Sequence, residues 1–341
     1  MGKLKRWLVF GGLATIALVA SYSLFRYLEH QAMHSIPAGF SRFDVSAPIP
    51  RCGRWKDHMP STRDAVVYER YIAARKLWRS KIEWQLTLQE TQSIFADVSF
   101  AAGRGDWGAK ALLAYFYLNG LGPMPSNHVV GQEASKAVAI AQQAAAAGQP
   151  WGIYDLGVAH QHGYGGAHYD LDLVWAYYLK AAQMGSPEAQ MALAEAYGGA
   201  GRLDDEEAML LCAFGQEHGA AAYQLGLQAR IMRQYPKALA TYQAGVKFGC
   251  KDCADALYLL FTEGYWGTAK PAEIQVLSAL GVVADPERSA RYEAISNALQ
   301  INPDLKLGRL DEFLPLPPAK LPEWRGVSDV ITPEPDGPPT Y

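Results

Sequence analysis

Three histidines in the segment AHQHGYGGAH form the densest group of side chains that could bind a metal ion. They are His160, His162 and His168. A metal site needs imidazole rings that converge from a rigid framework. His160, however, falls at a repeated aromatic position whose side chain should face the core, and the other two fall at a helix end and in a glycine-rich loop. We therefore predict neither a metal site nor a cofactor.

Two of the four cysteines have the Cys-x-x-Cys spacing of redox-active pairs. Cys250 and Cys253 would act in that way in a strand–helix–strand setting of the thioredoxin type, but no such setting surrounds them in the sequence. The pattern favours a structural thiol or a local disulfide instead. Together with Cys52 and Cys212 the cysteines are even in number, which permits one or two disulfides in an oxidising compartment and leaves their pairing open.

Sequence motifs of the common hydrolases and nucleotide-binding enzymes are absent from the 341 residues. There is no GxSxG, no HExxH, no phosphate-binding loop and no dinucleotide-binding fingerprint. The formal net charge of −3 gives no basic surplus, so binding of nucleic acid is not predicted. These absences favour a binding protein over an enzyme.

Five related segments between Ala109 and Glu263 dominate the chain. Each has a small residue, a leucine four places later with a residue beside it that is usually small, and often an aromatic residue three places further on. The small residues are Ala109, Gly152, Ala189, Ala221 and Cys253, and the leucines are Leu113, Leu156, Leu193, Leu225 and Leu257. A pattern repeated every 20 to 50 residues or so is typical of a solenoid.

An alanine-rich helix is predicted after each of the first four segments. These second helices begin near Lys136, Val174, Glu207 and Lys237, and each leads to a glycine, namely Gly148, Gly185, Gly219 and Gly249. A glycine can adopt the left-handed conformation that ends a helix. Each repeat is therefore a helix pair, and the pairs must stack because no single pair can bury its apolar face. The predicted fold is an all-α, right-handed α-solenoid.

The repeats resemble the Sel1-like family, which is related to the tetratricopeptide repeats. The resemblance lies in the frame from Ala109 to Gly120, with Ala114 at a position that is usually glycine, and in the frame from Lys136 to Gly148. It covers four repeats and the first helix of a fifth. It implies a fold that serves as a scaffold or binding surface, and it does not by itself imply an activity.

The N-terminus has the pattern of a membrane anchor. Residues 8–25 carry no charge, Lys3, Lys5 and Arg6 precede them, and Arg26 follows. About 20 apolar residues cross a bilayer, and flanking positive charges stay on the cytoplasmic side. We expect residues 1–26 to form one transmembrane helix in the inner membrane, with the remainder in the periplasm. A cleavable signal peptide is the alternative.

The remaining segments flank the repeats. Residues 27–64 are expected to be a proline-containing linker, and residues 65–108 a helical cap that covers the first repeat. Residues 109–264 contain the repeats, residues 265–313 a second helical cap, and residues 314–341 a proline-rich tail. Repeat arrays need such caps to shield their exposed ends. The segment LPLPPAKLPEW at the start of the tail is expected to pack onto the protein.

Three further motifs are similar to those of a family of bacterial envelope proteins. They are C-x4-DHMP from Cys52, AARKLW at residues 73–78, and LPLPPAKLPEWRG at residues 314–326, where Arg325 replaces the usual aspartate. Members of that family, like other Sel1-repeat proteins, often look like immunity proteins for type VI secretion lipase effectors. The resemblance implies a protein that sequesters such an effector.

One face of the first helices is predicted to bind the partner. Because a helix turns by 100° per residue, the core positions 152, 156, 157 and 160 define an opposite face, and first helices line the concave side of such stacks. The residues on this face are Tyr115, Asn119, Trp151, Tyr154, Asp155, His162, Glu188, Glu195, Tyr223, Gln224, Asp252, Asp255 and Glu263. Aromatic anchors beside charges suit a protein partner.

The sequence therefore predicts a non-enzymatic, protein-binding solenoid of the bacterial envelope. The first hypothesis is an immunity protein that neutralises a lipase-type effector. A scaffold or regulator of an envelope complex is the second hypothesis, and a cell-wall hydrolase with unrecognised catalytic residues is the third.

Overall fold

The computed structural model describes residues 35–60 and 63–333 of the chain. Within these residues it contains fifteen α-helices and three short 3₁₀ helices. The described part has no extended strand, only two isolated bridges, one between Leu121 and Val130 and one between Lys306 and Thr332. The prediction of an all-helical fold is therefore confirmed.

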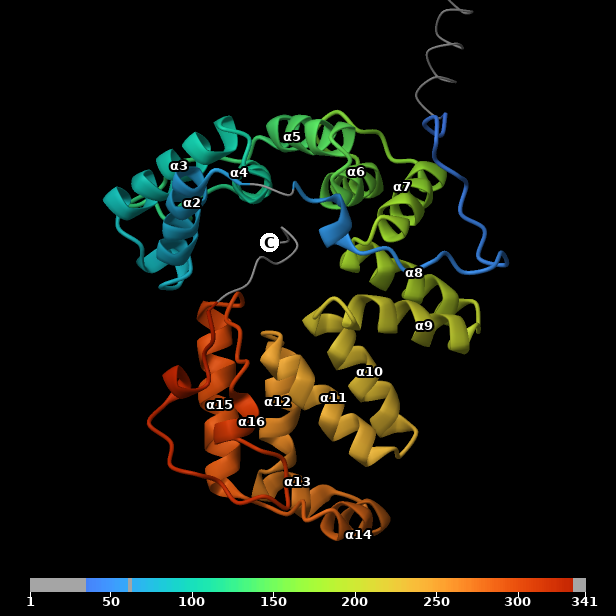
Figure 1. The fold of residues 1–341 in the computed structure, drawn as a ribbon, viewed down its shortest axis with the longest axis vertical. Coiled ribbons are helices and arrows are strands. Elements are labelled where there is room, and N and C mark those ends of the chain that lie inside the picture. Colours follow the sequence, from blue (N-terminus) through green and yellow to red (C-terminus); the bar gives the residue numbers. More distant parts are fainter. Residues whose placement is uncertain (1–34, 61–62, 334–341) are drawn as a thin grey trace, which may run out of the picture.

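The helices follow one another around an arc (Figure 1). The first eight are α2 (Ala65–Trp78), α3 (Leu88–Gly103), α4 (Trp107–Asn119), α5 (Ala134–Ala146), α6 (Pro150–His162), α7 (Leu171–Gln183), α8 (Pro187–Gly199) and α9 (Leu203–Phe214). The others are α10 (Gly219–Ile231), α11 (Tyr235–Lys247), α12 (Lys251–Leu260), α13 (Glu263–Thr268), α14 (Pro271–Ala279), α15 (Pro286–Ile301) and α16 (Leu310–Phe313).

Neighbouring helices pack as pairs in the order of the sequence repeats. The pairs are α4 with α5, α6 with α7, α8 with α9, and α10 with α11, and consecutive pairs stack on one another. The fifth first helix, α12, has no second helix directly after it and packs mainly on α15. The array thus ends where α15 takes the place of the missing partner.

Most helix ends follow local sequence signals. The side chains of Asp106, Asp170 and Ser186 accept hydrogen bonds from the backbone N–H three residues on, at the starts of α4, α7 and α8. Such caps satisfy N–H groups that have no partner within the helix. Gly148 and Gly185 have the positive φ angles expected after α5 and α7.

Gly219 does not end a helix, and this part of the prediction is wrong. It is the first residue of α10, and Glu217 adopts the left-handed conformation after α9, with a φ angle of 62°. The reason for a glycine here is space, since a Cβ atom at Gly219 would lie 2.9 Å from the Cβ of Cys250. The residue lets the start of α10 approach the start of α12.

Glycines in the repeats allow a tyrosine of the second helix to lie directly on the first. A Cβ atom at Gly157 would come within 2.7 Å of the Tyr178 ring, and one at Gly226 within 2.5 Å of the Tyr242 ring. Gly152 is enclosed in the same way by α5. These small residues therefore set how closely neighbouring helices can pack.

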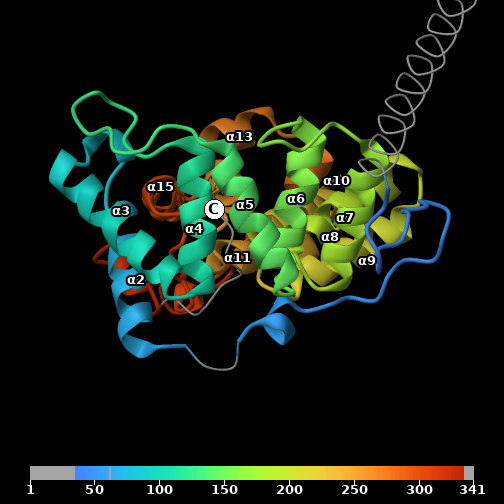
Figure 2. The same ribbon diagram turned by 90° about the horizontal axis from the view of Figure 1, so that it is seen from above.

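Residues 35–58, which we call the N-terminal strap, pack along one edge of the array (Figure 2). They belong to the segment predicted as a linker. The ring of Phe43 stacks on Trp175 with centres 5.1 Å apart. The Arg202 guanidinium donates hydrogen bonds to the carbonyl oxygens of Val45 and Ala47. Aromatic packing and hydrogen bonds thus hold the strap against α7 to α9.

A disulfide also fixes the N-terminal strap to the array. Cys52 is bonded to Cys212 of α9, which is 160 residues away in the sequence. Next to it, Trp55 is only 4% exposed, and its backbone N–H donates a hydrogen bond of 3.0 Å to Gln216. Cys250 and Cys253 form a second, local disulfide at the start of α12. The pairing that the sequence left open is therefore 52 with 212 and 250 with 253.

Two buried arginines of α15 hold the proline-rich segment that starts the tail. Arg288 donates a hydrogen bond of 2.9 Å to the carbonyl oxygen of Ala319, and Arg291 one of 2.7 Å to that of Pro322. Leu314 at the beginning of this segment is fully buried. Extended proline-rich chain lacks internal hydrogen bonds, so these arginines provide donors for its carbonyl groups.

The two ends of the array meet at one carboxylate. Asp304, in the loop after α15, lies 2.8 Å from Nη2 of Arg75 on α2 and 3.4 Å from Nε of Arg79, the residue that follows α2. These side chains are largely shielded from solvent, which weakens the screening of their attraction. Figure 1 shows α2 and α15 facing each other across this seam. The described helices thus trace a nearly closed ring.

No helix within residues 35–60 and 63–333 is both long enough and apolar enough to span a bilayer. The predicted transmembrane segment, residues 8–25, lies outside the described residues.

We predict that Gly157→Ala lowers the melting temperature by several degrees. The added methyl group forces the Tyr178 ring to move, and such overpacking costs about 1–3 kcal/mol. Calorimetry measures the change. The control is Gly199→Ala, which places a methyl group in open space at the end of α8 and should leave the melting temperature unchanged or slightly higher. Equal effects of the two substitutions would contradict the packing role of Gly157.

We also predict that Asp304→Ala opens the ring. The substitution leaves Arg75 and Arg79 without their shared carboxylate, so the ends should separate and the radius of gyration measured by small-angle X-ray scattering should increase. Asp97→Ala is the control, because it breaks an ion pair with Arg70 that lies within the α2–α3 pair. The radius of gyration should stay the same in the control. If the radius of gyration also stays the same in Asp304→Ala, contacts other than those of Asp304 hold the two ends of the array together.

Candidate protein-binding groove

Two adjoining cavities form one groove along the first helices of the array. The first, with a volume of about 350 Å³, is lined by α4, α5, α6 and α8. The second, of about 510 Å³, is lined by α6, α8, α9 and the start of α10. Tyr154 and Glu188 line both cavities. We call the combined surface the aromatic–acidic groove.

The groove brings together a large part of the predicted binding face. Helical spacing on the first helices was the basis of that prediction, and the cavities lie between these same helices. The predicted residues that line the groove are Tyr115, Asn119, Trp151, Tyr154, Asp155, Glu188, Glu195 and Gln224.

The other five predicted residues lie away from the groove. His162 is exposed at the end of α6, and Tyr223 packs near the Tyr242 ring. Asp255 accepts a hydrogen bond from Ser296 and pairs with Lys251, while Asp252 and Glu263 are exposed at the starts of α12 and α13. The acidic residues near the end of the array therefore do not extend the groove.

Trp151 is buried, although the helical pattern predicted an exposed aromatic side chain. It is 4% exposed and packs with Ala111 and Ala144. The reason is its place in the first turn of α6, directly after Pro150, where the helix enters between α4 and α5. The indole Nε1 of Trp151 has no hydrogen-bond partner within the described part of the chain.

Asp155 and Glu188 bring two carboxyl groups from different helices into the first cavity. Burial raises the pKa of Asp155 to about 7, and the nearby Glu188 carboxylate contributes to the same shift. One oxygen of Glu188 accepts a hydrogen bond of 3.1 Å from Ser186, and the other lies 3.8 Å from Nδ1 of His218. Ionisation of Asp155 in this cavity is therefore less favourable than in water.

Tyrosine rings form much of the wall around these carboxyl groups. Tyr154 stacks on Tyr178 with ring centres 5.2 Å apart. Burial raises the pKa of Tyr154 and raises that of Tyr164 to about 12. The phenols are consequently neutral at physiological pH. They offer ring faces and hydroxyl groups to a ligand.

Sequence reasoning missed three polar residues of the groove. Tyr164 lies in the loop after α6, Glu206 on α9, and His218 just before α10. The prediction considered only the first helices, so it could not include a loop or a second helix. The segment GYGG around Tyr164 is evident in the sequence, but a glycine-rich loop has no periodicity from which the orientation of the tyrosine side chain could be predicted.

The histidines that could have bound a metal have other contacts. Nδ1 of His160 lies 2.9 Å from the carbonyl oxygen of His168, and its ring stacks on Tyr177. Among the described residues, no group of three or more His, Cys, Asp or Glu side chains could hold a metal ion.

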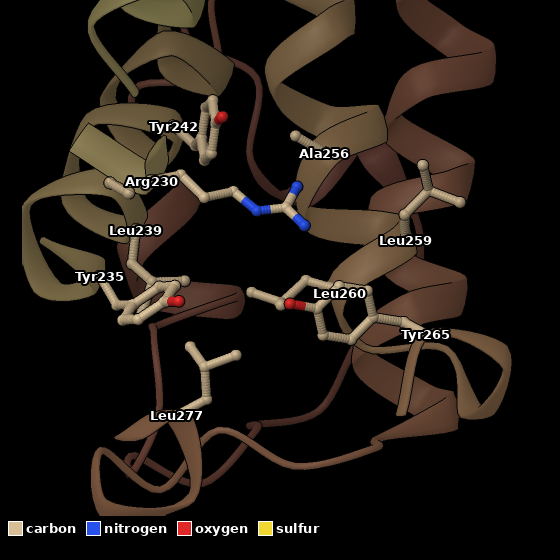
Figure 3. A pocket seen from close by; sticks show the side chains of 10 residues that line it. Arg230, Tyr235, Leu239, Tyr242, Ala256, Leu259, Leu260, Tyr265 and Leu277 are labelled. Atoms are coloured by element: carbon tan, nitrogen blue, oxygen red, sulfur yellow. The ribbon is translucent and has the colours of Figure 1, made fainter. Parts of the chain in front are cut away.

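A smaller, mostly apolar pocket lies between α10, α11, α12 and the helices that follow (Figure 3). Arg230 reaches across it, 5.5 Å from the centre of the Tyr265 ring and 3.9 Å from the Glu273 carboxylate. The volume of about 50 Å³ holds a few water molecules at most. This pocket is too small to be the main binding site.

The stacked helix pairs and the small-residue packing define the chain as an α-solenoid, and its repeat motifs resemble the Sel1-like family. Three solved structures from Pseudomonas aeruginosa are similar to it over most of its length. One is the protein PA5086, with 29% identity, a TM-score of 0.62, and coverage of 80% of this chain and 96% of that one.

The other two are described as immunity proteins. They are Pa5087, with 27% identity and a TM-score of 0.61, and PA5088, with 26% identity and a TM-score of 0.60. Each match covers 79% of this chain and 94% of the relative. The predicted resemblance of this chain to immunity proteins is thereby confirmed.

A family model of a domain of unknown function, DUF6396, matches residues 260–332. This region runs from the end of α12 through the proline-rich segment. No functionally curated protein matches the chain.

We predict that Asp155→Asn stabilises the protein at high pH. The folded-state pKa of about 7 lies above the ordinary value of 3.8, so the wild-type protein loses stability as the pH rises from about 4 to 7. Asparagine removes this loss. At pH 8 the melting temperature should rise, by about 2–4 °C for each kcal/mol recovered, and at pH 4 it should equal that of the wild type.

The control for this prediction is Glu195→Gln, since Glu195 lines the groove but is exposed. Its melting temperature should follow that of the wild type at both pH values. A stabilisation by Asp155→Asn that is the same at pH 4 and pH 8 would contradict the assignment.

Proposed function

We propose that the protein is a non-enzymatic immunity protein that binds and neutralises a toxic effector. The observation that carries the proposal is the similarity to two immunity proteins over 94% of their length. Identities of 26–27% with matching helical arrays support a shared way of working as well as a shared fold.

The aromatic–acidic groove is the part of the protein that we propose contacts the effector. It contains tyrosine and tryptophan side chains, which are frequent among the residues that dominate the binding energy of interfaces, beside carboxyl groups that can pair with a basic partner. The stacked helices hold these groups in place before binding. Little conformational entropy is then lost when the partner docks, which favours affinity.

A lipase-type effector of type VI secretion is the partner that we propose. The support is the sequence resemblance at Cys52, at residues 73–78 and at residues 314–326. Each of these motifs has a structural role, since Cys52 bonds to Cys212, Arg75 pairs with Asp304, and residues 314–326 pack on α15. Bound effector would have its active site covered or its approach to the lipid blocked.

We further propose that the protein is anchored in the inner membrane with its body in the periplasm. The uncharged run at residues 8–25 and the positive charges before it support this orientation. The Cys52–Cys212 disulfide also supports an oxidising compartment, because disulfides persist there and are rare in the cytosol. The lipids attacked by a lipase-type effector are accessible from that compartment.

A protection assay tests the proposal. Candidate lipase-type effectors of the source bacterium are expressed one at a time, each with an export signal, in cells that lack this gene. We expect growth to stop, and the full-length protein to restore growth by at least tenfold in colony counts. A version without residues 1–34 should remain in the cytoplasm and fail to protect.

Two results would contradict the immunity function. Slow growth of the deletion strain in the absence of the toxin gene would favour a scaffold of the envelope. Hydrolysis of cell-wall material by the purified protein would favour an enzyme.

A further inference from the structure

The aromatic–acidic groove gathers negative charge without a matching cation. Asp155 and Glu188 line its first cavity, and Glu195 and Glu206 line its second. Among the residues that line the two cavities, His218 alone can carry a positive charge. The Glu188 oxygen that faces His218 is shielded from solvent and has no hydrogen-bond partner in the described part of the chain.

A second, independent feature of the cavity is a buried hydrogen-bond donor. Trp151 is 96% buried, since its exposed fraction is 4%, and its indole N–H has no acceptor among the described residues. It lines the same cavity as Asp155. Buried donors nearly always have an acceptor, and a ligand that enters the cavity can supply one.

Tyrosine rings complete the cavity. Tyr154 and Tyr164 line it together with Asp155 and Glu188. The faces of aromatic rings carry partial negative charge and attract cations. The chemistry of the wall therefore suits a ligand that has a flat, positively charged group and a hydrogen-bond acceptor close to it.

We propose that the groove receives an arginine side chain of the partner protein, with its guanidinium between Asp155 and Glu188 and its main-chain carbonyl accepting from Trp151. The planar guanidinium has five N–H donors, which carboxylates on two different helices can share, and it stacks on aromatic rings. The ammonium group of lysine is more strongly hydrated and cannot stack in this way. This inference rests on the proposed function, because it specifies how the effector is recognised.

The free groove is prepared for such a charge. Asp155 and Glu188 repel each other when both are ionised, so an arriving guanidinium interacts favourably with both carboxylates at once. The carboxyl groups are already desolvated in the folded protein, and the partner therefore does not have to remove their hydration.

The first test uses the full-length protein in detergent micelles and N-acetyl-arginine methylamide as the probe. The NMR signal of the Trp151 indole N–H, assigned from its loss in Trp151→Phe, reports occupation of the cavity. We expect a saturable shift with the arginine compound. The matching citrulline compound has the same shape without charge, and we expect no shift from it at the same concentrations. No shift with arginine, or equal shifts with both compounds, would overturn the proposal.

The second test removes the two carboxylates. Asp155→Asn combined with Glu188→Gln keeps the side-chain volumes, and we expect it to weaken binding of the arginine probe at least tenfold. The control is Asp252→Asn, which alters an exposed aspartate of α12 outside the groove and should bind like the wild type. If the double variant does not fold, Glu188→Gln alone should still weaken binding several-fold. Unchanged binding of the arginine probe by a folded variant would contradict the proposal.

Binding of the lipase-type effector that stops growth in the protection assay separates this inference from the immunity function. A tenfold loss of affinity in the double variant, together with protection by the wild type, supports both the arginine site and the immunity function. Full affinity and protection in the double variant overturn the arginine site and leave the immunity function standing. Probe binding by a protein that fails to protect leaves the site standing and overturns the function.

Discussion

Close packing at glycine and alanine is the constraint on which the rest of the structure depends. Tyr178 and Tyr242 of the second helices lie directly on the backbone of the first helices at Gly157 and Gly226. This contact leaves no room for a Cβ atom, so it sets both the distance and the rotation between the paired helices. The positions of Asp155 and its neighbours in the groove follow from that rotation, because they occupy the opposite face of the same helix.

The helix pairs could be predicted because their signals are local. The small residue, the leucine four places later and the capping residues such as Ser186 all act within one or two helical turns. The contacts that close the array are different in kind. Asp304 pairs with Arg75, which is 229 residues away in the sequence, and Cys52 is bonded to Cys212, which is 160 residues away. Neither pair belongs to a repeat. Periodicity carries no information about such pairs.

The candidate site was predictable for similar reasons and within similar limits. Helical spacing identified Tyr154, Asp155 and Glu188, because α6 and α8 are regular repeats with regular neighbours. It assigned Trp151 to the surface, since a wheel projection ignores how the first turn of a helix enters the array. It also extended the binding face to Asp255, where the repeat pattern continues in the sequence but α15 has replaced the expected second helix. The predicted residues outside the groove are not confined to that end, since His162 and Tyr223 belong to the regular helices α6 and α10.

The Cys52–Cys212 disulfide has a mechanical consequence. A pulling force applied to the two ends of the chain would pass through this covalent bond and bypass the loop of residues 53–211 that it closes. Asp155, Glu188 and the helices that carry them lie inside that loop. When the chain is pulled at its ends while a partner occupies the groove, these helices therefore lie outside the path of the force. The carboxyl groups of the groove keep their positions even when the chain outside the loop is under tension.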